Sequence, residues 1–155
     1  MARSFQRETY EDVIGDIRPI LELHWREVAR YPDIPLQPNW TAYEHLQALD
    51  ILRIYTGRED GRLIGYSIFV VHKDLHYSTS LTADEDLLFL APEYRKGRVG
   101  LQLMQFAEAE LTAEGVQLVK RRTKVAERLN FGALLERMGY EPIDVIYGKR
   151  LDKGT

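Results

Sequence analysis

The pattern of apolar and polar positions predicts a short strand and then a long helix at the start of the chain. Residues 4–10 have the mixed character of a short strand. From Asp12, the expected N-cap, apolar residues recur at helical spacing and form one stripe. Pro19 interrupts this stripe, so a kink or a late helix start is expected there. The stripe consists of Ile14, Ile17, Ile20, Leu21, His24, Trp25 and Val28.

The middle of the chain reads as a loop, a short helix and a hairpin. Residues 31–40 contain three prolines and are expected to form a loop. Thr41 is the expected cap of a second helix, with Glu44 as its capping-box partner. Two β-rich runs, residues 51–56 and 63–71, are joined by a Gly- and Asp-containing connector, which is typical of a hairpin.

The remaining segments predict strands that alternate with helices. Residues 78–90 read as a long strand that ends in an apolar run, and a helix is expected from about Val99 to Gly115. Further strands are expected at 116–123 and 143–151, with a helix at 131–138 between them. We therefore expect residues 1–155 to form a single mixed α/β domain on one central sheet.

Composition narrows the class of protein. The chain has 155 residues, which is enough for one domain with a real core, and its net charge of −3 argues against a protein that coats DNA. It has no cysteine, which excludes disulfides, thiolate nucleophiles and cysteine zinc sites. No apolar run approaches the roughly 20 residues of a membrane span, and the first residues lack a secretory signal. A cytoplasmic protein with no membrane partner is expected.

The most informative segment is a basic, Gly-containing turn, residues 95–100, that follows the apolar run and opens into a helix. Free N–H groups and the positive dipole end at a helix N-terminus bind anions, and glycines allow close backbone approach. Arg95, Lys96 and Arg98 add positive charge. The turn therefore predicts a pyrophosphate site, and the alternative is a solvated loop.

At this turn the chain resembles the GNAT superfamily of acetyl-CoA-dependent N-acetyltransferases. The superfamily's turn is Gln/Arg-x-x-Gly-x-Gly/Ala after the fourth strand; Arg95 matches its first position and Gly100 its last, while Arg98 replaces a Gly. Residues 130–140 also resemble the superfamily's last helix and its Gly-aromatic ending. The resemblance implies a mostly antiparallel mixed sheet of about six to seven strands, flanked by about four helices. Homodimers are common in similar proteins.

More narrowly, the chain resembles a subgroup often encoded by bacteriophages, which would place it in the host cytoplasm. The segments that carry this likeness are 24–27, 35–36, 75–77 and 131–137. The acceptors of this subgroup are largely unassigned.

The resemblance implies acetyl-CoA as co-substrate and assigns residues to it. The Leu90 N–H would contact the thioester oxygen, Phe89 and Leu90 would pair with the pantetheine arm, and the turn would hold the pyrophosphate. The expected cofactor-binding residues are Phe89, Leu90, Arg95, Lys96, Gly97, Arg98, Val99, Gly100 and Asn130.

Three consecutive carboxylates upstream of the apolar run are candidates for the base that deprotonates the amine. Alternation along a strand puts Asp84 and Asp86 on one face and Glu85 on the other. Crowded carboxylates raise one another's pKa, which suits proton acceptance near neutrality. Asp86 is the first choice, because it is closest to the buried run, and Glu85 is the second; the alternative is a hydrophilic strand end.

The acid that would protonate the leaving thiolate is left open. The superfamily's usual Tyr corresponds to Leu135 in this chain. The acid is therefore absent, supplied by Tyr140 or Tyr147, or replaced by water.

Further polar residues are candidates for contacts with the acceptor. His24 and Glu27 share a helix face, although a lone His on an apolar face is more often a core residue. His76 and Tyr77, between two strands, face the acceptor or are ordinary sheet residues. His72 and His76 have a spacing that binds metal on a helix, but this stretch reads as strand and turn, so no metal is expected.

The leading hypothesis is an N-acetyltransferase that moves an acetyl group from acetyl-CoA to a small-molecule amine or an amine-bearing macromolecule by direct attack. One alternative is a non-catalytic GNAT-fold module that binds acyl-CoA or a protein, motivated by Leu135. Another is acetylation of an amino-modified base in phage DNA, motivated by the phage-like segments and the basic cluster at 120–124. Nucleic acid is the disfavoured acceptor.

Overall fold

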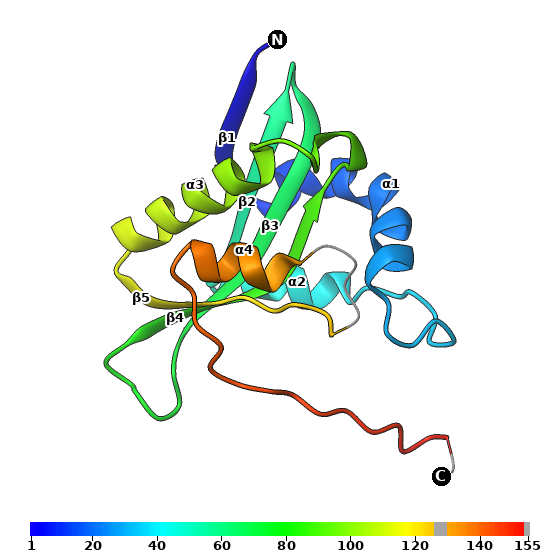
Figure 1. The fold of residues 1–155 in the computed structure, drawn as a ribbon, viewed down its shortest axis with the longest axis vertical. Coiled ribbons are helices and arrows are strands. Elements are labelled where there is room, and N and C mark those ends of the chain that lie inside the picture. Colours follow the sequence, from blue (N-terminus) through cyan, green and yellow to red (C-terminus); the bar gives the residue numbers. More distant parts are fainter. Residues whose placement is uncertain (126–129, 154–155) are drawn as a thin grey trace. The chain divides into compact units, whose positions relative to one another are not determined.

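The computed structural model describes residues 1–125 and 130–153, in two compact units that divide at residues 122 and 123. The first unit contains β1 (Arg3–Glu8), α1 (Tyr10–Val28), α2 (Trp40–Ala48), β2 (Leu52–Glu59), β3 (Arg62–Lys73), β4 (Leu81–Leu90), η1 (Pro92–Tyr94), α3 (Val99–Ala113) and β5 (Val116–Lys120). The second unit contains α4 (Phe131–Arg137). The expected mixed α/β class and the order of its first elements are confirmed, while the assignment of residues 1–155 to a single domain stays a prediction (Figure 1).

One sheet runs through the first unit, in the order β1-β2-β3-β4-β5. Its first four strands pair antiparallel and β5 pairs parallel with β4, so the sheet is mixed and mostly antiparallel, as expected. The described residues form five strands rather than six or seven. The strand predicted at 143–151 is wrong: this stretch is irregular, because a strand needs a partner and the described part of its own unit contains only a helix.

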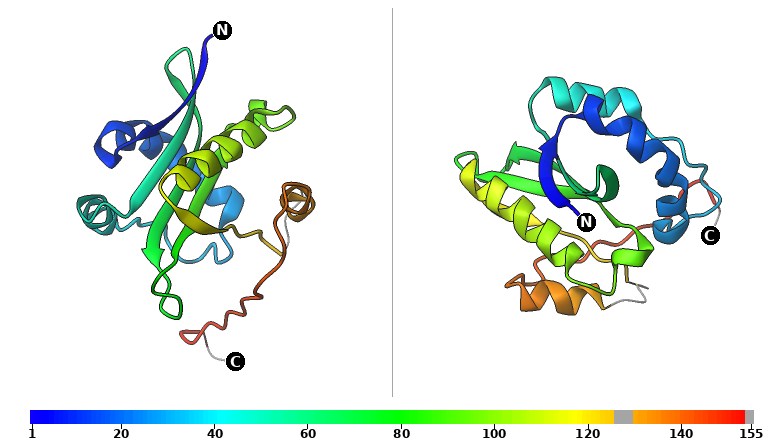
Figure 2. Two further views of the ribbon diagram at one scale, coloured as in Figure 1. Left: turned by 90° about the vertical axis from the view of Figure 1, so that its left-hand side faces the viewer. Right: turned by 90° about the horizontal axis from the view of Figure 1, so that it is seen from above.

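Helices cover the sheet of the first unit on both faces. Apolar residues of α1 and α2 pack on one face with Ile54 and Ile68, and α3 packs on the other with Tyr55 and Phe69. Figure 2, seen from above, shows α1 and α2 on one side of the strands and α3 on the other. Alternation along each strand separates the two cores, so neighbouring residues contribute to opposite faces.

Both N-terminal helices begin earlier than the sequence predicted. Thr9 caps α1, because its Oγ1 accepts from the Asp12 N–H at 3.3 Å while the Asp12 carboxylate accepts from the Thr9 N–H at 3.4 Å. Asp12 is thus the second half of a capping box. Asn39, not Thr41, caps α2, and its Oδ1 accepts from the Ala42 N–H at 3.0 Å. Helix α1 runs through Pro19 as one element.

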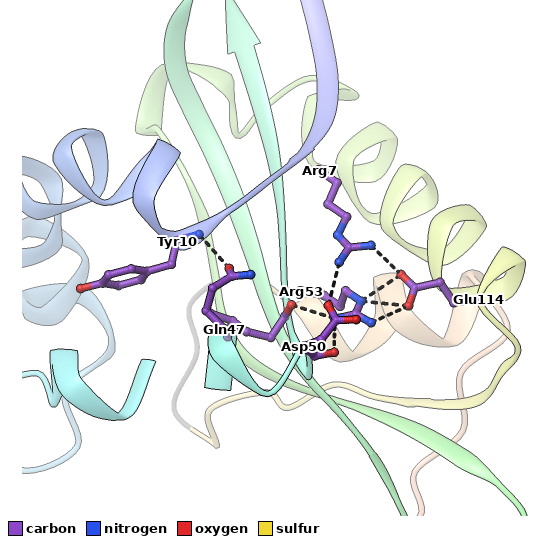
Figure 3. Close-up of polar contacts among 7 residues, drawn as sticks. Arg7, Tyr10, Gln47, Asp50, Arg53 and Glu114 are labelled. Carbon is purple, nitrogen blue, oxygen red and sulfur yellow. Dashed lines mark hydrogen bonds and ion pairs between the residues drawn. The ribbon is translucent and has the colours of Figure 1, made fainter. Parts of the chain in front are cut away.

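A polar network ties the end of α3 to β1, to β2 and to the residues just before β2 (Figure 3). The Arg53 Nε donates to both carboxylate oxygens of Glu114 at 2.9 Å, and the Arg53 Nη1 donates to the Asp50 carbonyl at 2.7 Å. Arg7 donates to the same carboxylate of Glu114 at 3.3 Å. The Arg53 side chain is almost fully buried, so its charge requires these partners, and the network fixes the C-terminus of α3.

Candidate active site

The C-terminal half of β4 has one open edge within the first unit. Strand β5 pairs with β4 from Leu81 to Asp84 only, whereas β3 pairs with β4 as far as Leu90. Within residues 1–122, the backbone groups of Glu85–Leu90 therefore have no strand partner on the β5 side. Such an edge can receive an extended ligand as an additional strand.

The basic turn follows this edge and leads into α3. Arg98 is the N-cap and makes no side-chain capping bond, so the first amides of the helix keep their donors for another partner. Arg98 has φ −98° and ψ 0°, and because this φ is negative the position does not require Gly. Lys96, Gly97 and Arg98 are exposed, while Val99 is buried. This geometry can hold a phosphate group.

Two glycines allow Leu90 to lie against the start of α3. A Cβ added to Gly100 would be 3.3 Å from the Leu90 Cδ2. A Cβ added to Gly65, on β3, would be 2.9 Å from the Leu90 Cδ1 and 3.0 Å from the Phe89 carbonyl oxygen. The open edge and the turn are close because both glycines lack side chains.

The side chain of Arg95 turns back onto β4 and α1. Its Nε donates to the Leu90 carbonyl at 2.8 Å, and its Nη2 donates to the Glu27 carboxylate at 2.7 Å. Its guanidinium lies 5.7 Å from the centroid of the Phe89 ring. Four residues predicted from the sequence are thus brought together.

His24 lies beside them and is only 3% exposed. Its Nδ1 is 2.8 Å from the Tyr66 hydroxyl oxygen, and its ring centroid is 5.1 Å from that of Phe89. These contacts agree with the alternative that His24 is a core residue. Burial, and then the charge of Asp86, raises the pKa of Tyr66, so its hydroxyl stays protonated at neutral pH.

A bulge at Asp86 interrupts β4. Leu87 pairs with Ile68 and Glu85 pairs with Phe69, which leaves Asp86 unpaired between them. Its carboxylate is exposed and accepts a hydrogen bond from the Tyr43 hydroxyl on α2. Burial, and then Asp86, raises the pKa of Tyr43, so this hydroxyl is the donor. The sequence indicated Asp86 as a candidate base, but nothing in the sequence indicated that Tyr43 contacts it.

Glu85 lies on the α3 face in a buried ion pair. Its carboxylate accepts hydrogen bonds from the Arg121 guanidinium and, at 2.9 Å, from the Ser67 hydroxyl. The side chains of Glu85 and Arg121 are 5% and 0% exposed. Burial raises the pKa of Glu85, and Arg121 and Ser67 oppose that shift. The basic cluster predicted at 120–124 is divided, because Arg121 points into the core.

The β3–β4 turn carries His76 and Tyr77 at the other end of β4. Both side chains are exposed, and the Asp74 carboxylate accepts from the His76 N–H at 2.8 Å. Strand β4 has 10 residues, so its length separates this turn from Leu90 by roughly 30 Å. The structure therefore does not bring His76 and Tyr77 together with His24 and Glu27.

The second unit holds the remaining candidates. Asn130 caps α4, since its Oδ1 accepts from the Ala133 N–H at 3.1 Å. Leu135 is buried, and its carbonyl accepts from the Tyr140 N–H at 2.9 Å. Tyr147 is exposed. Among the described residues, no group of three or more His, Cys, Asp or Glu could hold a metal ion.

A comparison with protein families decides the classification. Residues 50–142, well over half of the chain, match the acetyltransferase (GNAT) domain. The chain belongs to the GNAT acetyltransferase family. The acyltransferase class expected from the sequence is thereby confirmed.

Solved structures of acetyltransferases share the fold. A ribosomal-protein-alanine N-acetyltransferase from Brucella melitensis biovar Abortus 2308 is 15% identical, with a TM-score of 0.72 over 97% of this chain and 99% of that one. AAC(6')-Iy, in complex with the bisubstrate analog CoA-S-monomethyl-acetylneamine, is 18% identical, with a TM-score of 0.72 over 97% of this chain and 99% of that one. A predicted acetyltransferase with acetyl-CoA from Clostridium acetobutylicum is 9% identical, with a TM-score of 0.71 over 97% of each chain.

No curated protein matches the sequence significantly. In the described part of this GNAT chain, no helix is both long and apolar enough to cross a membrane.

Proposed function

We propose that this GNAT chain transfers an acetyl group from acetyl-CoA to an amine acceptor by direct attack. The observation that carries the proposal is the open edge of β4 beside the uncapped N-terminus of α3. The edge suits an extended amide-bearing arm, and the turn suits a pyrophosphate. These are the two chemical parts of CoA, in the order in which they occur along the molecule.

The residues predicted from the sequence would hold acetyl-CoA in the following way. Phe89 and Leu90 would pair with the pantetheine arm, and the Leu90 N–H would polarise the thioester carbonyl. The amides from Gly97 to Gly100 would bind the pyrophosphate, with Lys96 and Arg98 adding charge. Asn130 remains a candidate for a further contact.

Asp86 would accept the proton that the ammonium must lose before its nitrogen attacks the thioester carbon. It is exposed, and the Tyr43 hydroxyl orients it. As the C–N bond forms, the C–S bond breaks, and the thiolate takes a proton from Tyr140 or from water. Glu85 is the weaker candidate, because its carboxylate is already engaged by Arg121 and Ser67.

The acceptor is proposed to be an amine, in keeping with the bisubstrate analog CoA-S-monomethyl-acetylneamine that AAC(6')-Iy holds. His24, Glu27, His76 and Tyr77 were predicted to contact it, but His24 is buried, and roughly 30 Å of β4 separates His76 and Tyr77 from Leu90, which is too far for contact with an amine that attacks the thioester. The phage-type subgroup, the dimer and the cytoplasmic location remain predictions from the sequence.

The experiment is a screen of amines for release of CoA from acetyl-CoA by the purified chain, together with calorimetric titration of acetyl-CoA. Gly100→Glu would put a side chain against Leu90 and a negative charge at the turn, so we expect binding to weaken by at least about 100-fold. Unchanged affinity would contradict the pyrophosphate assignment. Tight binding without release for any amine would favour a non-catalytic acyl-CoA module.

A further inference from the structure

The last turns of α1 are joined to the end of β4 through one guanidinium. Arg95 donates to the Glu27 carboxylate at 2.7 Å and to the Leu90 carbonyl at 2.8 Å. The side chains of Arg95 and Glu27 are 30% and 31% exposed, so the pair is partly shielded from water. One helical turn before Glu27, His24 contacts the ring of Phe89, which also lies beneath Arg95.

We propose that Arg95 and Glu27 form a strut that holds the basic turn in its anion-binding shape, so that Arg95 is a positioning residue and not a phosphate ligand. The proposal rests on the proposed function, because it assigns a role within the same donor site. It also gives Glu27 a role in the binding of acetyl-CoA rather than in contact with the acceptor.

The directions of the hydrogen bonds support this assignment. The Nε and Nη2 of Arg95 point to Leu90 and Glu27, and the plane of a guanidinium fixes the directions of its donors. A phosphate that used the single Nε donor would have to displace the Leu90 carbonyl, and one that took the place of Glu27 would have to break the ion pair. The Glu27 carboxylate also cancels its charge.

Lys96 and Arg98 are better placed to supply charge to the anion. Both are exposed, and within the part of the chain that the structure describes no ion pair engages either of them. The turn thus divides its cations by role: Arg95 sets the shape of the turn, and the next two cations meet the ligand.

The strut should affect the affinity for acetyl-CoA by changing the fraction of molecules whose basic turn is in the shape that binds it. Without it, the turn would sample other conformations, and the apparent dissociation constant would rise by the factor by which the competent fraction falls. The expected size is modest, since the pair is partly exposed.

The test measures the dissociation constant of acetyl-CoA by calorimetry for Glu27→Gln, Arg95→Gln and the double variant. We expect each single variant to raise the dissociation constant about threefold to tenfold. The double variant should raise it no further than the single variant with the larger effect. Glu22→Gln is the matched control, because Glu22 lies on the same helix in an exposed ion pair with Arg26 and should leave affinity unchanged.

A direct phosphate contact would give a different pattern. Freeing Arg95 in Glu27→Gln would then leave affinity unchanged or improve it, and Arg95→Lys would keep part of the affinity because it keeps the charge. For the strut, Arg95→Lys is as weak as Arg95→Gln, since a lysine cannot hold Leu90 and Glu27 together.

The two proposals fail in different ways. If the wild-type chain does not bind acetyl-CoA, the proposed function is wrong. If the wild type binds and Glu27→Gln binds equally well, with urea titration showing both chains folded, only the strut is wrong.

Discussion

Glu85 and Asp86 are neighbours on β4, yet their side chains lie in two different environments. Glu85 lies on the α3 face, where it is buried and paired with Arg121. Asp86 lies at the bulge, where it is exposed and meets Tyr43 of α2. Two carboxylates with the same intrinsic chemistry therefore differ in what they can contact, because one is enclosed by a cation and the other can be reached by a ligand.

The largest effect is expected for Asp86→Asn. We expect it to lower kcat by about 100-fold to 10,000-fold with the best amine, because an amide cannot accept the proton. Steady-state kinetics with saturating acetyl-CoA would measure the loss. Asp84→Asn is the matched control, two residues away on the same strand, and should keep most of the activity. Equal activity of both variants would remove Asp86 from the mechanism.

On the α3 face, we expect substitution of the carboxylate to lower the stability of the protein rather than its activity. Glu85→Ala would leave the Arg121 guanidinium buried without its carboxylate, and we expect the free energy of unfolding to fall by about 3–5 kcal/mol. Urea denaturation would measure the change. A loss below about 1 kcal/mol would show that the pair is not enclosed in solution.

Tyr43 offers a finer test of the Asp86 environment. Tyr43→Phe removes the hydroxyl that donates to Asp86, and we expect kcat to fall by about threefold to tenfold with little change in stability. Tyr55→Phe is the control on the α3 face, because the Tyr55 hydroxyl is buried and finds no hydrogen-bond partner among the described residues. If Tyr55→Phe lowered kcat by the same factor, the effect would not come from Asp86.

The smallest effect concerns the third carboxylate, Asp84. Its hydrogen bond to His72, and then that of the Lys73 carbonyl, raises the pKa of His72 above 6.5. A raised folded-state pKa stabilises the protein fully below about pH 6.5, and this stability is lost as the pH rises through the folded-state value. The unfolding free energies of wild type and His72→Gln should therefore differ by less than about 1 kcal/mol at low pH and converge at high pH. A difference that grows with pH would contradict this assignment.

The sequence predicted some residues of the candidate site and missed others. The turn and the carboxylates were found because glycine, basic and acidic residues mark their chemistry locally. Tyr43, Tyr66 and Arg121 were missed, since nothing in their neighbourhoods separates them from ordinary helix, strand and basic-cluster residues. The expected N-caps were wrong by a few positions, because Thr9 and Asn39 offered earlier acceptors.

The sequence alone is enough to predict the order of the helices and strands as far as α4 and to locate the basic turn and the run of carboxylates, because these depend on periodicity and on residue types close together in the chain. Only the tertiary structure decided which carboxylate is buried, that Arg95 turns back to Glu27, and that residues 143–151 do not form a strand. Each of these depends on a partner distant in sequence, 36 residues away for Glu85 and 68 for Arg95, or on the lack of a strand partner in the described part of the second unit.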